Sequence, residues 1–251
     1  MFIACWSAKG GVGTTVVAAG LALATRTANR AAPSLLVDLD GDLPCCLGLP
    51  DPEGPGVAEW AASGPEVPPD ALSRLEVPVT TGLALLPRGH GPLLPDRIDL
   101  LVSLLIASGR RVVVDCGALG PPQARRARVD SSRAGGERQH GPVAGAEPEG
   151  SVDRRVQAAA RVVAAAPSSL LVVRPCVMGL HRSSRLGLRP SGVVVIREPG
   201  RALRAADVEA VVGAPVLAEL ALDPAVARAV DAGLLGARLP RGFADALAAV
   251  A

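Results

Sequence analysis

The sequence has almost no lysine and few aromatic side chains. Of its 26 basic residues 25 are arginine, Lys9 is the single lysine, tyrosine is absent, and Phe and Trp number two each. The abundance of alanine, glycine, proline and arginine indicates a GC-rich coding sequence, in which arginine is the default basic residue. The place where a lysine does occur is therefore informative.

Other absences exclude whole classes of protein. No apolar run reaches the roughly 18 residues of a membrane-spanning helix, and the opening MFIACW lacks the basic and long apolar regions of a secretory signal. The five cysteines show no CxxC spacing, which indicates buried cytosolic thiols rather than disulfides or zinc. The three histidines are scattered, without the spacing of metal ligands. We therefore expect a cytoplasmic protein.

Short apolar runs alternate with longer helical segments along the chain. With 251 residues, 49% of them hydrophobic, the chain can build a substantial core. The apolar runs are continuous rather than alternating, as in strands buried on both faces of a parallel sheet. The sequence predicts one α/β domain, a doubly wound and mostly parallel sheet flanked by helices. Strands are expected at residues 2–6, 35–37, 83–86, 111–115, 170–173, 193–196 and 216–220, and helices at 16–24 and 100–107.

Three segments depart from this alternation. Residues 51–69 are rich in Pro, Gly and Glu and predict a loop with a short helix at 57–62. Residues 121–155 have almost no large apolar side chain and predict a flexible insertion or linker. Residues 174–204 hold seven arginines against one acid, Glu198. This segment is either a surface for phosphate or acidic lipid, or a solvated surface.

A glycine-rich loop follows the first predicted strand and opens the first helix. It runs Lys9-Gly10-Gly11-Val12-Gly13-Thr14-Thr15. Glycines let successive backbone N–H groups turn toward an anion, and the helix N-terminus behind them adds partial positive charge. The Thr15 hydroxyl is placed to ligate Mg²⁺. The common phosphate loop ends in Gly-Lys-Ser/Thr; here Thr14 holds the lysine position, and Lys9 lies five places earlier.

Carboxylates follow two of the predicted strands. Asp38 and Asp40 come after the run at 35–37, and Asp115 ends the run RVVVD. In open α/β sheets, ligands bind in the crevice outside the carboxyl ends of the strands. We therefore expect these side chains at the same crevice as the glycine loop.

The loop KGGVGTT resembles the deviant Walker A motif, K-G-G-x-G-K-[ST], of the MinD/ParA group of P-loop ATPases. The resemblance extends to LLVDLDGDLPCCLGL at 35–49, to RVVVDCG at 111–117 and to the helix–strand–helix pattern at 207–235. It implies ATP and Mg²⁺ as cofactors, and a nucleotide-dependent homodimer in which Lys9 reaches the partner's phosphates. It also implies that Asp38 and Asp115 lie near the metal and that Asp40 orients the attacking water. The segment VVVIREPGR at 193–201 resembles the loop beside the base, which makes Arg197 and Pro199 nucleotide contacts.

Within that group, the sequence looks most like the CpaE/TadZ-like, septum-site-determining-like branch. Such proteins often have degenerate Walker residues and are associated with placing pilus or secretion machinery, or the septum, which implies partner proteins of those machineries. Many carry an N-terminal receiver-like domain. This chain starts at the first strand of the ATPase domain, so that domain is either absent or not part of this chain.

Thr14 predicts weakened chemistry, because a hydroxyl brings no charge to the phosphates. We expect nucleotide binding with slow or absent hydrolysis. Two alternatives remain open: a dimeric scaffold that recruits partners without hydrolysis, and a ParA-like protein that binds DNA non-specifically through residues 174–204. The tail at 238–251 has Phe243, Leu247 and Val250 on one helical face but is short and mostly alanine. It is therefore expected to pack against the domain, with membrane contact peripheral at most or made through partners.

Overall fold

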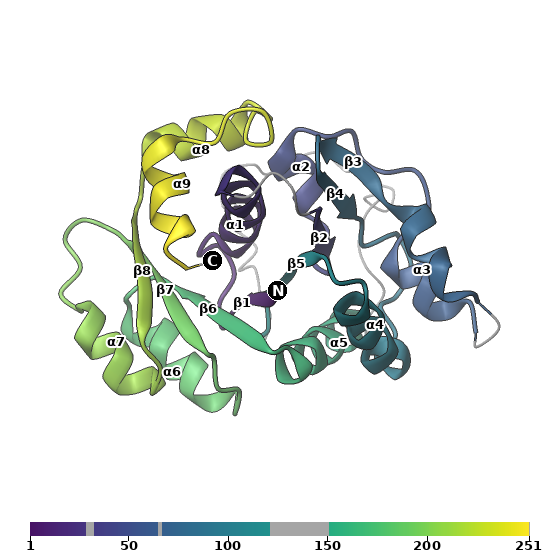
Figure 1. The fold of residues 1–251 in the computed structure, drawn as a ribbon. Coiled ribbons are helices and arrows are strands. Elements are labelled where there is room, and N and C mark those ends of the chain that lie inside the picture. Colours follow the sequence, from purple (N-terminus) through teal and green to yellow (C-terminus); the bar gives the residue numbers. More distant parts are fainter. Residues whose placement is uncertain (29–32, 65–66, 121–150, 251) are drawn as a thin grey trace, which may run out of the picture.

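An eight-stranded sheet forms the centre of the molecule, as the computed structural model shows (Figure 1). The structure describes residues 1–28, 33–64, 67–120 and 151–250. The strand order is β3-β4-β2-β5-β1-β6-β7-β8, and every neighbouring pair is parallel except β3 and β4. The predicted doubly wound α/β fold is therefore confirmed. The strands are β1 (Phe2–Ser7), β2 (Ser34–Asp38), β3 (Val77–Thr80), β4 (Leu83–Leu86), β5 (Arg111–Ala118), β6 (Ser168–Val173), β7 (Gly192–Arg197) and β8 (Val216–Ala221).

Helices cover both faces of this sheet (Figure 1). One face packs against α1 (Thr14–Ala28), α2 (Leu43–Leu47), α8 (Pro224–Asp231) and α9 (Arg241–Ala248). The other packs against α3 (Val57–Ala62), α4 (Ile98–Ala107), α5 (Ser151–Ala165), α6 (Val177–Arg185) and α7 (Ala205–Val212). Three short 3₁₀ helices lie at Pro69–Ala71, Ser73–Leu75 and Pro95–Arg97.

The continuous apolar runs arise because the central strands are buried on both faces. All six residues of β1 are buried, and neighbours in the chain belong to different cores. Ala4 and Trp6 contribute to the core under α4 and α5, whereas Ile3 and Cys5 contribute to the core under α1. All seven predicted strands are present. The eighth, β3, is an antiparallel edge strand that the sequence analysis did not identify, and Pro78 within it suits an edge.

Two sequence predictions need correction. Residues 121–150 of the predicted insertion lie outside the described residues, but residues 151–155 are the first five residues of α5, so the insertion was extended too far. The boundary was misplaced because α5 opens with polar residues before its buried stripe of small side chains. The cysteines are all free thiols, yet only Cys5, Cys46 and Cys116 are buried; Cys45 is exposed and Cys176 is half-buried.

The C-terminal helix packs against the domain, as predicted. Phe243 and Leu247 are buried in the core that includes α1. Gly20 on α1 makes this approach feasible, because a Cβ at that position would stand 2.7 Å from Cδ1 of Leu247. The apolar face of α9 is thus covered by the domain itself. No described helix is long and apolar enough to cross a membrane.

Candidate functional site

The glycine loop joins β1 to α1 at the carboxyl edge of the sheet. Gly11 and Gly13 have φ angles of 74° and 99°, a conformation that side chains with a Cβ rarely adopt. A Cβ added to Gly10, Gly11 or Gly13 would meet nothing within 4 Å, so the loop faces open space. The N-terminus of α1 points its free N–H groups and partial positive charge at the same space, which suits an anion.

The two threonines at the start of α1 have different surroundings. Thr14, at the position of the usual lysine, is buried, with 6% of its surface exposed. Thr15 hydrogen-bonds the Asp115 side chain, and this bond acts to lower the pKa of that carboxyl. The start of α1 is therefore hydrogen-bonded directly to β5.

Asp38 and Asp115 are register partners on the neighbouring parallel strands β2 and β5, and both are fully buried. The Asp38 carboxylate accepts backbone N–H bonds from Asp40 (3.0 Å), Gly41 (2.6 Å) and Leu43 (3.1 Å), which order the chain between β2 and α2. Burial raises the pKa of Asp38 to about 6, although these three donors act to lower it.

Asp115 has one satisfied and one unsatisfied oxygen. Its Oδ1 accepts the Gly117 N–H at 3.0 Å, whereas its Oδ2 is buried and has no partner among the described residues. Burial, reinforced by the charge of Asp38, raises the pKa of Asp115 to about 8. A buried oxygen without a donor is costly. A hard cation such as Mg²⁺ prefers oxygen ligands, so the donor set of Thr15, Asp38 and Asp115 fits it.

Asp40 lies beside these groups and is held by an arginine. Its Oδ1 is 2.8 Å from Nη1 of Arg155 on α5. The same guanidinium donates to the carbonyl oxygens of Cys116 (3.3 Å) and Ala118 (2.7 Å). A Cβ at Gly117 would overlap the Asp40 carboxylate, so the glycine lets the side chain lie against β5. Arg155 could not be predicted as a site residue while residues 121–155 were interpreted as an insertion. The helical spacing of the alanines and valines after it was the available signal.

Two cavities flank the glycine loop. On one side, residues 8–12 border a small cavity of about 80 Å³ together with Arg174 and α6. On the other side, Val12, Gly13 and Val16 border a cavity of about 270 Å³ that the ends of β7 and β8 and helix α8 complete. Its walls are mainly apolar, including Ile196 and Leu222, which suits a planar base. Neither of these two residues was identified from the sequence.

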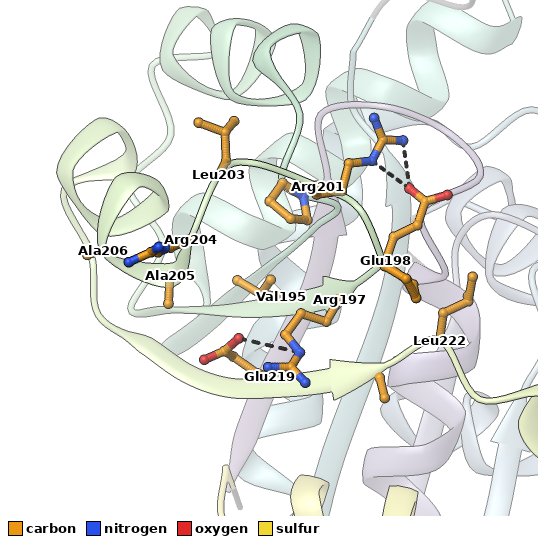
Figure 2. Close-up of a pocket in the computed structure, with 13 residues that line it drawn as sticks. Val195, Arg197, Glu198, Arg201, Leu203, Arg204, Ala205, Ala206, Glu219 and Leu222 are labelled. Carbon is orange, nitrogen blue, oxygen red and sulfur yellow. Dashed lines mark hydrogen bonds and ion pairs between the residues drawn. The ribbon is translucent and has the colours of Figure 1, made fainter.

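Arg197 and Pro199 line a third cavity, of about 680 Å³, next to α7. Figure 2 shows Arg197 facing Glu219 of β8, with the Arg197 Nε 3.9 Å from the carboxylate, and Arg201 paired with Glu198. Ile196 belongs to the core on the α1 face, and the next side chain along β7 points to the opposite face. The structure therefore groups Lys9, Asp38, Asp40, Asp115 and the loop from Gly10 to Thr15 at one edge, and places Arg197 and Pro199 in a neighbouring cavity.

No protein-family model and no curated protein matches the sequence, but solved structures match it along nearly its whole length. The septum site-determining protein MinD of Pyrococcus horikoshii OT3, complexed with Mg-ADP, has a TM-score of 0.69 at 18% identity, covering 99% of this chain and 93% of that chain. A ParA family ATPase from Chlorobium tepidum TLS has a TM-score of 0.67 at 17% identity, covering 99% and 98%. The MinC:MinD cell division complex of Aquifex aeolicus has a TM-score of 0.66 at 19% identity, covering 99% and 93%. At these identities the likeness concerns the fold: the chain has the α/β fold of the MinD and ParA P-loop ATPases.

Proposed function

We propose that this chain binds ATP with Mg²⁺ between its glycine loop and its buried carboxylates. One observation carries the proposal: Thr15 at the start of α1 hydrogen-bonds Asp115, whose second oxygen is buried without a partner and whose register partner is Asp38. This is an oxygen-rich cation site next to an anion-binding loop. The MinD structure complexed with Mg-ADP supports an adenine nucleotide with Mg²⁺ as the ligand of a protein of this fold.

Each group then has a distinct role. The backbone of residues 10–13 and the N-terminus of α1 hold the phosphates, while Thr15, Asp38 and Asp115 hold the cation. When bound, Mg²⁺ supplies positive charge to the phosphate oxygens. The apolar cavity beside Val12 and Val16 receives the base. Lys9 is half-buried at the edge of the loop, where it can extend to the phosphates of a second copy.

We further propose that hydrolysis is slow or absent, for two physical reasons. Thr14 brings no charge to the transferring phosphate, and such charge matters most in the transition state. Asp40, which the family resemblance gives the task of orienting water, already has one oxygen 2.8 Å from the Arg155 guanidinium. That ion pair competes with a water molecule for the carboxylate.

Calorimetric titration of ATP with and without Mg²⁺ tests the binding. We expect Mg²⁺-dependent binding that Thr15→Ala weakens, whereas the exposed and distant Ser103→Ala should leave it unchanged. Thr14→Lys adds a charge-assisted bond and should tighten binding about tenfold. An absence of ATP binding in the original protein would refute the proposal, and an unchanged affinity of Thr14→Lys would refute our assignment of position 14.

Phosphate release separates a weak ATPase from a scaffold without activity. We expect a rate far below that of an ordinary P-loop ATPase, and a further loss in Lys9→Ala if Lys9 acts across a dimer. Release that is undetectable and insensitive to Lys9→Ala would favour the scaffold. Light scattering with and without ATP tests the nucleotide-dependent homodimer directly.

At the cellular level we propose a role in positioning pilus, secretion or septum machinery through protein partners. The support is the KGGVGTT loop, with its resemblance to the CpaE/TadZ-like branch, and the fold shared with a MinD that assembles with MinC. A fluorescent fusion should localise to discrete sites, and Thr15→Ala should disperse it. A uniform distribution of the original protein would contradict the role.

Non-specific DNA binding receives less support from the arrangement of the arginines. Arg197 and Arg201 are engaged with Glu219 and Glu198 at the carboxyl edge of the sheet. Arg185 ends α6 and Arg189 precedes β7, so both lie toward the opposite edge. The arginines of residues 174–204 are therefore divided between two edges of the sheet. DNA retention at low salt that falls steeply with added salt would reverse this judgement.

A further inference from the structure

Arg174 is the first residue after β6, and its position relative to the glycine loop follows from the sheet. Strands β1 and β6 are parallel neighbours, with Trp6 opposite Leu171. The residues that follow both strands therefore emerge side by side at the carboxyl edge. Arg174 borders the small cavity formed with Lys9 and the large cavity formed with Gly13. Its side chain thus stands between the two spaces that flank the loop.

The Arg174 guanidinium lacks the partners that usually satisfy such a group. Its Nε is buried and has no hydrogen-bond partner within the described residues. The positive charges of Arg174 and Lys9 act with Arg201, whose effect is larger, to lower the pKa of Glu198. Arg201, in contrast, is paired with Glu198: its Nε and Nη2 lie 2.8 and 2.6 Å from Oε2 of that carboxylate. Among the described residues, Arg174 is consequently an arginine at this edge with a donor left to offer.

The glycine loop lacks a cation at the place where the common motif has one. Thr14 is uncharged, and only 6% of its surface is exposed. A polyphosphate seated on the loop would therefore meet backbone N–H groups and no charged side chain at position 14. A guanidinium is a planar fork whose donors match phosphate oxygens, and Arg174 holds such a fork at the border of the loop.

We infer that Arg174 supplies, within the same chain, the phosphate-binding cation that Thr14 does not. The ligand is the phosphate chain of a nucleoside di- or triphosphate. The inference rests on the nucleotide-binding function proposed above and adds to it a specific residue outside the loop. It also explains how a loop with a single lysine can hold a highly charged ligand.

Affinities for ATP, ADP, AMP and adenosine, measured by calorimetry with Mg²⁺, test this role. Losing charge-assisted bonds predicts that Arg174→Gln weakens ATP binding about 10- to 100-fold. The loss should shrink with fewer phosphates and vanish for adenosine. Arg174→Lys, which keeps the charge, should retain part of the affinity. The matched control is Arg189→Gln, an exposed arginine before β7 whose loss should change nothing.

A double variant tests whether Arg174 takes the place of the charge that is missing at position 14. If Arg174 replaces the charge missing at position 14, adding Thr14→Lys to Arg174→Gln should restore affinity close to that of the original protein. Equal ATP affinity in Arg174→Gln and the original protein would overturn the inference. An equal loss for adenosine and ATP would also overturn it, because Arg174 would then contact base or ribose. Failure of the original protein to bind any nucleotide would instead refute the proposed function, and the inference with it. Thermal unfolding of each variant shows whether the fold is kept.

Discussion

The buried carboxylates Asp38 and Asp115 should make the metal-free protein less stable as pH rises. Asp115 has a pKa of about 8 in the folded chain, because burial and the charge of Asp38 disfavour its ionised form; an unfolded aspartate has a pKa near 3.9. Between these values the native state holds a proton that the unfolded state has lost. The contribution of Asp115 to stability is therefore greatest below about pH 4 and falls by about 1.4 kcal/mol per pH unit until about pH 8.

The perturbation that isolates this effect is Asp115→Asn. Asparagine keeps an oxygen for the Gly117 N–H and does not titrate. From pH 5 to pH 7 the Asn variant should gain about 3 kcal/mol relative to the original protein. Asp38, whose pKa is about 6, adds a smaller loss to both proteins over the same range and leaves their difference nearly unchanged.

Urea unfolding in EDTA at pH 5, 6, 7 and 8 measures the difference. Glu53→Gln, which replaces an exposed carboxylate in a loop, is the control. Its free energy of unfolding should change with pH by the same amount as that of the original protein. If the free energy of unfolding of Asp115→Asn has the same pH dependence as that of the original protein, Asp115 is not protonated in the native state and the reasoning is refuted. Mg²⁺ with ATP should recover stability at pH 8 in the original protein and not in Asp115→Asn, because the cation takes the place of the proton.

Three further predictions concern the packing around the site. Gly117→Ala should destabilise the protein by about 1–3 kcal/mol in urea unfolding, because the new methyl meets the Asp40 carboxylate and the φ of +61° is strained; Ala118→Gly is the control for backbone effects. Gly20→Ala should cost about 1–3 kcal/mol and speed proteolysis of α9, because its methyl pushes Phe243 off α1, and unchanged proteolysis would contradict it. Arg155→Lys should lower the melting temperature nearly as much as Arg155→Gln, because one ammonium cannot match the fork that serves Asp40 and two carbonyls.

The sequence was informative where local pattern and fold agree. The run RVVVD predicted a buried strand because β5 is covered on both faces, and the glycines predicted a tight loop because Gly11 and Gly13 need positive φ angles. The pairing of Asp38 with Asp115 was expected only as proximity at one edge. Their register, and the buried oxygen that results, depend on how β2 and β5 align. No local pattern encodes that alignment.

Other parts of the site depend on contacts between distant segments. Arg155 meets Asp40 across more than a hundred residues, and the polar start of α5 gave no sign of a buried ion pair. For Arg197, the resemblance of its segment predicted a contact with the nucleotide base. The alternation of β7 turns its side chain to the other face of the sheet, toward Glu219 (Figure 2). The alternation of a strand determines which face of the sheet each side chain occupies. A sequence motif alone does not specify that face.

Besides Lys9 in the loop, two arginines, one on a helix and one after a strand, bring positive charge to the site. Arg155 projects from α5 and is fixed by two carbonyl oxygens, while Arg174 follows β6 and is set by the sheet. A loop lysine is a flexible point charge that can follow a phosphate as its geometry changes, whereas an arginine held at a strand end matches one geometry. Such an arrangement favours a bound ground state over a moving transition state. We therefore expect ATP binding with little hydrolysis, because Thr14 is combined with fixed arginines and not only because one lysine is lost.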